Sequence, residues 1–164
     1  DKAGEFYRKT FSGLFSYASH RIPEISDEVY KLDDALKAGF GWELGPFETW
    51  DAVGVEKAIA IMKENGKTPA DWITKMINNG NTSFYKLENG TKKYYDQNTG
   101  NYEVIPGTED LIFIDNLRDA NTVWSNNDCH LIDLGDGILN LEFHTKMNTI
   151  GGGGNRIQGL SDFK

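Results

Sequence analysis

The run at residues 96–103 carries oxygen-bearing side chains at the spacing of a partial calcium-binding loop. Asp96, Asn98 and Glu103 offer the carboxylate and amide oxygens that calcium prefers. A complete loop needs a further side-chain ligand and a correctly spaced terminal carboxylate, which this run lacks. Asp-Gln-Asn-Thr-Gly is also common in hairpin turns. We therefore expect a turn at this place, with calcium binding as the alternative.

The three histidines are the other residues that could bind a metal ion. His20, His130 and His144 lie far apart in the sequence, and none has a Cys or a second His at ligand spacing. His20 is expected at a helix end, where it can bond the last carbonyls. His130 and His144 flank an expected hairpin without a third ligand. We therefore expect structural roles for all three and no metal site.

Other catalytic patterns are incomplete in this sequence. Gly151–Gly154 lacks the Gly-Lys-Ser/Thr ending of a phosphate loop, so we expect a flexible connection there. There is no nucleophile elbow with a Ser-His-Asp or Cys-His order. Asp33 and Asp34 are expected on solvated helix faces. The residues alone therefore predict no catalytic, cofactor-binding or metal-binding side chain.

Composition limits the class of protein. The chain has 164 residues, 38% hydrophobic and 12% aromatic, which is enough for a packed core. Its formal net charge of −8 argues against binding to nucleic acid or to an anionic membrane. Cys129 is the single cysteine, which is typical of a reduced, cytoplasmic compartment. No apolar run approaches the roughly 20 residues of a membrane span. Because the sequence begins without Met and turns helical almost at once, we expect a piece of a longer chain.

Apolar spacing predicts four or five helices between residues 5 and 80. The first has the helical series from Tyr7 to Ala18 and ends near Pro23. Ser26 is expected to cap the second, whose buried stripe ends at Phe40. Pro46 suits the first position of the third, and Gly54 interrupts it. The last helix is expected to start with Pro in its favoured position in the capping-box-like run Thr68-Pro69-Ala70-Asp71.

The sequence changes character after residue 80. Short alternating runs joined by Asn-Gly and Asn-Thr-Gly predict a β meander over residues 81–114, with a last strand at 111–114. Residues 115–128 are polar and are expected to form a linker. Residues 129–164 contain a strong hairpin signal around Gly135-Asp136-Gly137. An isolated hairpin is marginal in water, so we expect this one to belong to a larger sheet. The predicted class is α+β, a helical domain followed by short antiparallel strands.

Residues 39–58, GFGWELGPFETWDAVGVEKA, resemble the signature of the C-terminal helical domain of 3-hydroxyacyl-CoA dehydrogenases. Glu43 departs from this signature, because many members carry Pro there. The run NNGNTSFYK at 78–86 is similar to the tail of the same domain, with two inner glycines lost, and the opening DKAGEFYRKT is similar to the start of a second helical repeat. The resemblance implies a fold like the C-terminal domain of 6-phosphogluconate dehydrogenase over residues 1–80. The signature and packing positions are Gly39, Gly41, Trp42, Gly45, Pro46, Phe47, Trp50, Asp51 and Gly54.

Residues 130–150 are similar to the opening hairpin of the enoyl-CoA hydratase (crotonase) family, with Asn148-Thr149-Ile150 at its turn. Together the two resemblances imply a parent enzyme of fatty-acid β-oxidation that oxidises 3-hydroxyacyl-CoA with NAD and hydrates 2-enoyl-CoA. Its NAD-binding Rossmann domain would lie upstream, and most of its hydratase domain downstream. The chain itself is then expected to bind neither NAD nor acyl-CoA and to serve as a scaffold between these partner domains.

Two questions stay open for the aromatic residues. Trp42, Phe47 and Trp50 either fill the core of their own domain or dock a partner domain. A different hypothesis is a non-enzymatic interaction module, in which tyrosines on the short sheet present an apolar binding face. That hypothesis rests on Tyr85, Tyr94, Tyr95 and Tyr102.

Overall fold

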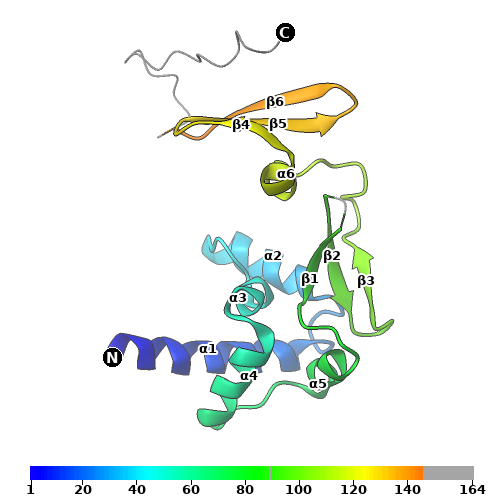
Figure 1. Cartoon of the computed structure of the whole chain (residues 1–164). Helices are drawn as coiled ribbons and strands as arrows, with labels where there is room; N and C mark the ends of the chain where they lie inside the picture. The colour runs from blue at the N-terminus through cyan, green and yellow to red at the C-terminus, as the bar shows by residue number, and fades with distance from the viewer. Residues whose placement is uncertain (89, 146–164) are drawn as a thin grey trace. The chain divides into compact units, whose positions relative to one another are not determined.

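The computed structural model describes residues 1–88 and 90–145. The chain divides into two compact units, unit 1 at residues 1–111 and unit 2 at residues 112–164. Each contains helix and antiparallel sheet, so the α+β class is confirmed (Figure 1). The predicted boundary at residue 80 differs from this division, because the strands of the meander belong to unit 1.

Unit 1 begins with five helices, as the apolar spacing predicts. Pro46 is the first residue of α3, and Gly54 separates α3 from α4, both as expected. The bounds are α1 (Lys2–Arg21), α2 (Val29–Phe40), α3 (Pro46–Val53), α4 (Val55–Glu64) and α5 (Asp71–Asn78).

Two predicted helix starts are wrong. The hydroxyl of Ser26 accepts from the Glu28 N–H, but α2 begins only at Val29 and has no side-chain cap. Pro69 lies outside α5, which begins at Asp71. The N–H of Ala70 instead donates to the Ser19 hydroxyl of α1 at 3.0 Å, so a residue from another helix takes the capping role. Caps supplied from a distance leave no local sequence pattern.

Three strands follow the helices and form the expected meander. They are β1 (Tyr85–Glu88), β2 (Thr91–Asp96) and β3 (Asn101–Val104), antiparallel in the order β1-β2-β3. The turn between β2 and β3 holds the candidate calcium ligands. There Asp96 accepts from its neighbour Asn98 N–H at 2.7 Å, and Thr99 donates to Glu103 at 3.3 Å. These contacts are those of a hairpin turn.

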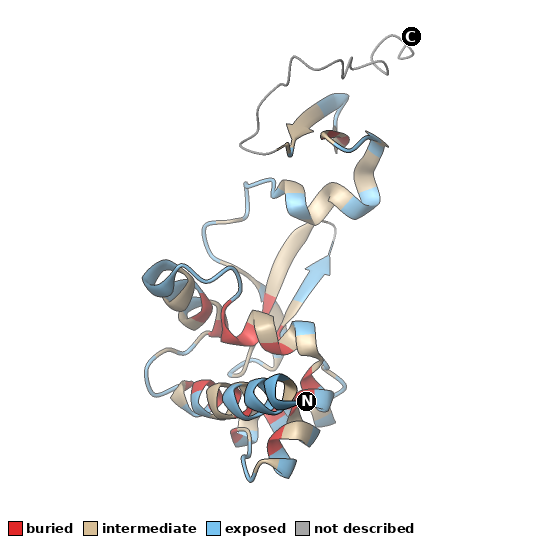
Figure 2. Ribbon diagram, turned by 90° about the vertical axis from the view of Figure 1, so that its left-hand side faces the viewer, coloured by how far each residue is buried: buried red, intermediate tan, exposed pale blue. Residues whose placement is uncertain are grey.

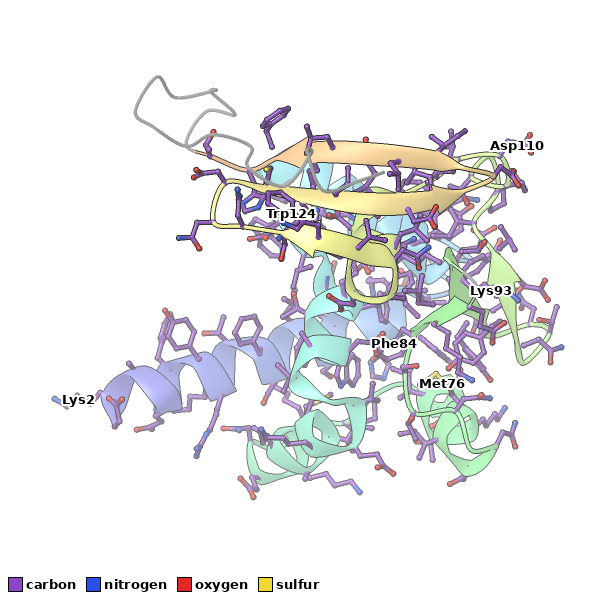
Figure 3. The ribbon with its side chains drawn as sticks, turned by 45° about the horizontal axis from the view of Figure 1, so that its top comes forward. Lys2, Met76, Phe84, Lys93, Asp110 and Trp124 are labelled. Atoms are coloured by element: carbon purple, nitrogen blue, oxygen red, sulfur yellow. The ribbon has the colours of Figure 1, made fainter. Side chains whose placement is uncertain are left out.

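The core of unit 1 lies where the helices meet the sheet (Figure 2). Phe15 of α1 stacks on Trp50 of α3, with ring centroids 4.8 Å apart. Phe84 packs against both Phe47 and Trp50, and Figure 3 labels it within this region. The predicted stripe of α2 is wrong at its end, because Phe40 is 70% exposed.

Unit 2 contains α6 (Ile114–Asn121) and the antiparallel sheet β4-β5-β6. The predicted hairpin is confirmed as β5 (Cys129–Gly135) and β6 (Ile138–Phe143), and β4 (Thr122–Ser125) extends it. The predicted linker at 115–128 is wrong, since α6 and β4 occupy most of it. The strand expected at 111–114 is also absent from the structure. The sequence pattern does not predict helix α6, because none of its residues is buried. Arg118 of α6 donates two hydrogen bonds to Glu142 of β6.

Some predictions fall on residues outside those that the structure describes. They concern Asn148-Thr149-Ile150 and Gly151–Gly154. Among the described helices, none is long and apolar enough to cross a bilayer.

Candidate functional site

The signature residues meet at the start of α3, where the helix needs an acceptor for its first N–H groups. Its N-cap is Gly45, which has no side chain to offer. The carboxylate of Asp33, in the middle of α2, takes that place. It accepts from the Phe47 N–H at 2.8 Å and from the Glu48 N–H at 3.1 Å. Asp33 is thus a helix cap supplied from another helix.

Asp33 is fully buried, which corrects the prediction of a solvated helix face. Its third hydrogen bond comes from the hydroxyl of Tyr85 in β1, at 2.7 Å. Burial raises the pKa of Asp33 to about 7, against the lowering effect of the bonds from Phe47 and Tyr85. The same burial, together with the Asp33 charge, raises the pKa of Tyr85, so this hydroxyl stays a donor.

Gly45 lies so close to Asp33 that no larger residue fits. A Cβ placed on Gly45 would lie 2.5 Å from both Cα and Cγ of Asp33 and closer still to its Cβ. The φ of Gly45 is −74°, which any residue can adopt, so its need for glycine comes from space alone. Gly41 is required for a different reason. It ends α2 at a φ of 66° and donates its N–H to the Lys37 carbonyl.

Glu48 completes the cap from inside α3. It accepts from the Gly45 N–H at 3.0 Å, the reciprocal bond of a capping box. Lys92 of β2 lies 2.6 Å from Glu48 Oε1, and Lys37 of α2 lies 3.1 Å from Oε2. Burial opposes ionisation of Glu48, but its bonds with Lys92, Gly45 and Lys37 outweigh it and hold the pKa below the usual range.

Asp51 connects α3 to the first strand. Its carboxylate accepts from the Phe84 N–H at 2.8 Å and from the Tyr85 N–H at 2.9 Å. Burial raises its pKa to about 6, although these two N–H donors lower it. Trp50, beside it, donates its indole N–H to the Val55 carbonyl at 3.3 Å. The side chain of Asp51 in α3 is therefore bonded to the backbone at the start of β1.

The remaining signature positions lie apart from this cluster. Trp42 is 42% exposed and packs on Phe40, with ring centroids 5.8 Å apart, so it does not fill the core as Phe47 and Trp50 do. Gly54 joins α3 to α4 at a φ of 91°. A Cβ placed on Gly39 would meet nothing within 4 Å.

The tyrosines of the interaction-module hypothesis face inward. Tyr94 and Tyr95 are buried in the core, and Tyr85 and Tyr102 pack against it. The Tyr102 hydroxyl donates to the Ser83 carbonyl at 2.5 Å. The sheet therefore does not present the expected tyrosine face, because its aromatic side covers the helices.

The histidines take the local positions expected for them. His20 Nδ1 lies 2.8 Å from the Ser16 carbonyl one turn earlier in α1. His130 and His144 lie together, with ring centroids 4.3 Å apart, and Glu142 is 3.6 Å from His130. Within residues 1–88 and 90–145, no cluster of three or more His, Cys, Asp or Glu could hold a metal ion.

Two carboxyl groups with raised pKa values, Asp33 and Asp51, predict how stability depends on pH. The pKa values of Asp33 (about 7) and Asp51 (about 6) lie above the value of 3.8 expected when unfolded. The folded state then binds more protons between pH 4 and 7, so the free energy of unfolding should fall as pH rises through this window, by about 2 kcal/mol per pH unit. Urea denaturation at several pH values measures this slope.

The matched variant for this prediction is Asp33→Asn, which cannot titrate. Its slope between pH 5 and 7 should be flatter than that of the unmodified chain, whatever the absolute loss of stability. A free energy of unfolding that rises over this window in the unmodified chain, or an unchanged slope in the variant, would contradict the assignment.

The fold and the site together define a helical domain against which a small sheet packs. Carboxylates of the helices bind the helices to one another and to the sheet. The sequence model of the "3-hydroxyacyl-CoA dehydrogenase, C-terminal domain" matches residues 2–94, more than half of the chain, and the chain belongs to this family. The match extends past residue 80, where the predicted helical domain ends, and includes β1 and most of β2.

Relatives point the same way. The chain is 40% identical over 152 residues to the Bacillus subtilis protein named "Probable 3-hydroxyacyl-CoA dehydrogenase". The aligned residues cover 92% of the chain and 19% of that protein. A Rickettsia felis protein, named as a trifunctional enzyme of a fatty acid oxidation complex, is 31% identical over 45 residues, 27% of the chain and 6% of that protein. The chain thus spans about a fifth of the first relative and far less of the second. No solved structure matches the chain.

Proposed function

We propose that this chain is a structural part of an enzyme that oxidises 3-hydroxyacyl-CoA with NAD in fatty-acid β-oxidation. Family membership and the long match to the Bacillus subtilis protein support the dehydrogenase. The observation that carries the structural role is the use of three carboxylates around α3, of which Asp33 is buried and Glu48 and Asp51 are half-buried. Asp33, Glu48 and Asp51 accept bonds from backbone N–H groups and lysines of their own unit, so each of them already connects parts of the fold.

The start of α3 does not fit the pyrophosphate of a dinucleotide. A pyrophosphate binds where helix N–H groups point into open space. At the start of α3 the N–H groups of Phe47 and Glu48 already donate to the Asp33 carboxyl group. Three glycines of the signature, Gly41, Gly45 and Gly54, cap or join helices. We therefore propose that NAD binds to another part of the whole protein.

For unit 2 we propose the start of a hydratase domain. The support is the hairpin of β5 and β6 over the residues that resemble the enoyl-CoA hydratase family. The 152 matched residues of the Bacillus subtilis relative also extend well past the 2–94 of the family match, so unit 2 shares ancestry with that protein. The parent would then carry both activities on one polypeptide.

The test compares the 164-residue chain with the product of its full gene. With NADH and acetoacetyl-CoA, the chain is expected to show no oxidation of NADH above buffer, while the full product turns over. Circular dichroism of the chain, with a cooperative thermal transition, serves as the control for folding. Turnover by the folded chain would overturn its structural role, and an inactive, folded full product would overturn the dehydrogenase itself.

A further inference from the structure

Two Asn-Gly pairs end helices of unit 1 with the same backbone geometry. Asn65 follows α4 and Asn79 follows α5, each as the C-cap residue, with φ and ψ of −93° and 13° at Asn65 and of −84° and 8° at Asn79. The next residue has a positive φ in both, 66° at Gly66 and 82° at Gly80, and donates its N–H to a carbonyl of the last turn. A third Asn-Gly pair in the sequence includes Asn89, which lies outside the described residues.

The side chains of these two asparagines differ in what holds them. Asn65 is half-buried, and its amide nitrogen donates to the Ile61 carbonyl at 2.9 Å and to the Ser12 hydroxyl at 3.4 Å. Asn79 is exposed, and its side chain forms no hydrogen bond with any residue in the described part of the chain. The first side chain is therefore fixed against its helix, whereas the second can rotate.

An asparagine side chain that can rotate is able to react with the next backbone nitrogen. That nitrogen attacks the side-chain carbonyl carbon Cγ, so a bond from nitrogen to Cγ forms and the bond from Cγ to Nδ2 breaks. Nδ2 takes the proton of the attacking N–H and leaves as ammonia. Water then opens the five-membered succinimide at either of its two carbonyl groups, which gives aspartate or isoaspartate. A following glycine favours the attack, because it has no side chain to crowd the nitrogen.

We propose that Asn79 is a site of spontaneous deamidation in the folded protein and that Asn65 is protected from it. At both positions the backbone hydrogen bond of the following glycine must open, which is easiest at a helix end. Asn65 must in addition break the two hydrogen bonds of its side chain before Cγ can approach the attacking nitrogen. The two sites therefore share a backbone and differ in one barrier.

Deamidation at Asn79 would change the end of α5 in two ways. A new carboxylate would lie at the negative end of the helix dipole. Isoaspartate would also place one additional carbon in the main chain before Gly80. The N–H of Gly80 donates to the Ile77 carbonyl at 2.8 Å. The N–H of Asn81 donates at 3.0 Å to the carbonyl of Met76, which Figure 3 labels. Both bonds close the turn that leads from α5 toward the sheet.

Incubation of the folded 164-residue chain at mildly alkaline pH, followed by peptide mapping, tests this proposal. Trypsin cuts after Lys and Arg and places the three Asn-Gly pairs in separate peptides, residues 64–67, 76–86 and 87–92. Liquid chromatography with tandem mass spectrometry then locates each aspartate and isoaspartate. In the folded chain, deamidation should be faster at Asn79 than at Asn65 by about tenfold or more, because two hydrogen bonds protect the Asn65 side chain.

The same incubation in concentrated urea separates the effect of the fold from that of the sequence. There the two asparagines should react at similar rates, since neither side chain is held. Asn79→Gln should remove the deamidated form of peptide 76–86, because the longer side chain closes its ring far more slowly. Asn78 and Asn81 in that peptide are not followed by Gly and should stay unchanged. Equal rates in the folded chain, no reaction at Asn79, or a difference that persists in urea would overturn the proposal.

Discussion

Gly45→Ala is expected to destabilise unit 1 by about 3 kcal/mol or more, since overpacking a rigid, buried contact costs this much. The added methyl group would meet Cα and Cγ of Asp33 at 2.5 Å. The backbone of α2 cannot retreat without lengthening the bonds from Phe47 and Glu48 to the Asp33 carboxylate. Equilibrium urea denaturation, followed by tryptophan fluorescence, measures the loss.

Gly39→Ala is the control for this prediction. Gly39 belongs to the same signature and lies within α2, but nothing lies within 4 Å of the position where its Cβ would stand. Because Ala favours a helix over Gly, this variant should be as stable as the unmodified chain or slightly more so. Equal losses for the two variants would show that the close approach of Gly45 to Asp33 is not what requires glycine.

Trp50→Ala should be the most damaging truncation, with a loss of about 3–5 kcal/mol. Trp50 is 0% exposed and lies between Phe15, which it stacks on at 4.8 Å, and Phe84, at 5.2 Å. Its removal leaves a cavity between helices and sheet, and the Val55 carbonyl loses its indole donor. Thermal unfolding by circular dichroism gives the change in midpoint.

The same substitution at Trp42 provides the comparison. Trp42 is also a tryptophan of the signature, but it is largely exposed and its aromatic contact is with Phe40, which is itself exposed. Trp42→Ala should therefore change the free energy of unfolding by about 0.5 kcal/mol at most. A large loss at Trp42, or a small one at Trp50, would reverse the roles that the structure gives them.

Sequence reasoning predicts best those elements whose spacing and turn residues lie within a short stretch of the chain. The helical stripe of α1, Pro46 at the start of α3, and the hairpin of β5 and β6 each follow from spacing and turn residues within a short window. The family of unit 1 can be predicted from the sequence for a related reason, since the signature at residues 39–54 is contiguous.

What sequence reasoning missed depends on contacts between distant residues. The sequence predicts a solvated face for Asp33, yet its partners Phe47 and Tyr85 lie 14 and 52 positions away. One signal was present: a helix that begins Gly45-Pro46 has no side chain of its own at the N-cap and must find an acceptor elsewhere. Helix α6 was missed because it has no buried stripe to reveal its period.

The bonds that end on β1 also decide where this protein can be divided for study in pieces. A cut after residue 80, where the helical pattern stops, would strip the Asp51 carboxylate of both its N–H donors and Asp33 of its hydroxyl donor. It would also remove Phe84, whose ring covers Phe47 and Trp50. The smallest self-sufficient piece must therefore run through the first hairpin, which makes those strands the closing part of the helical domain.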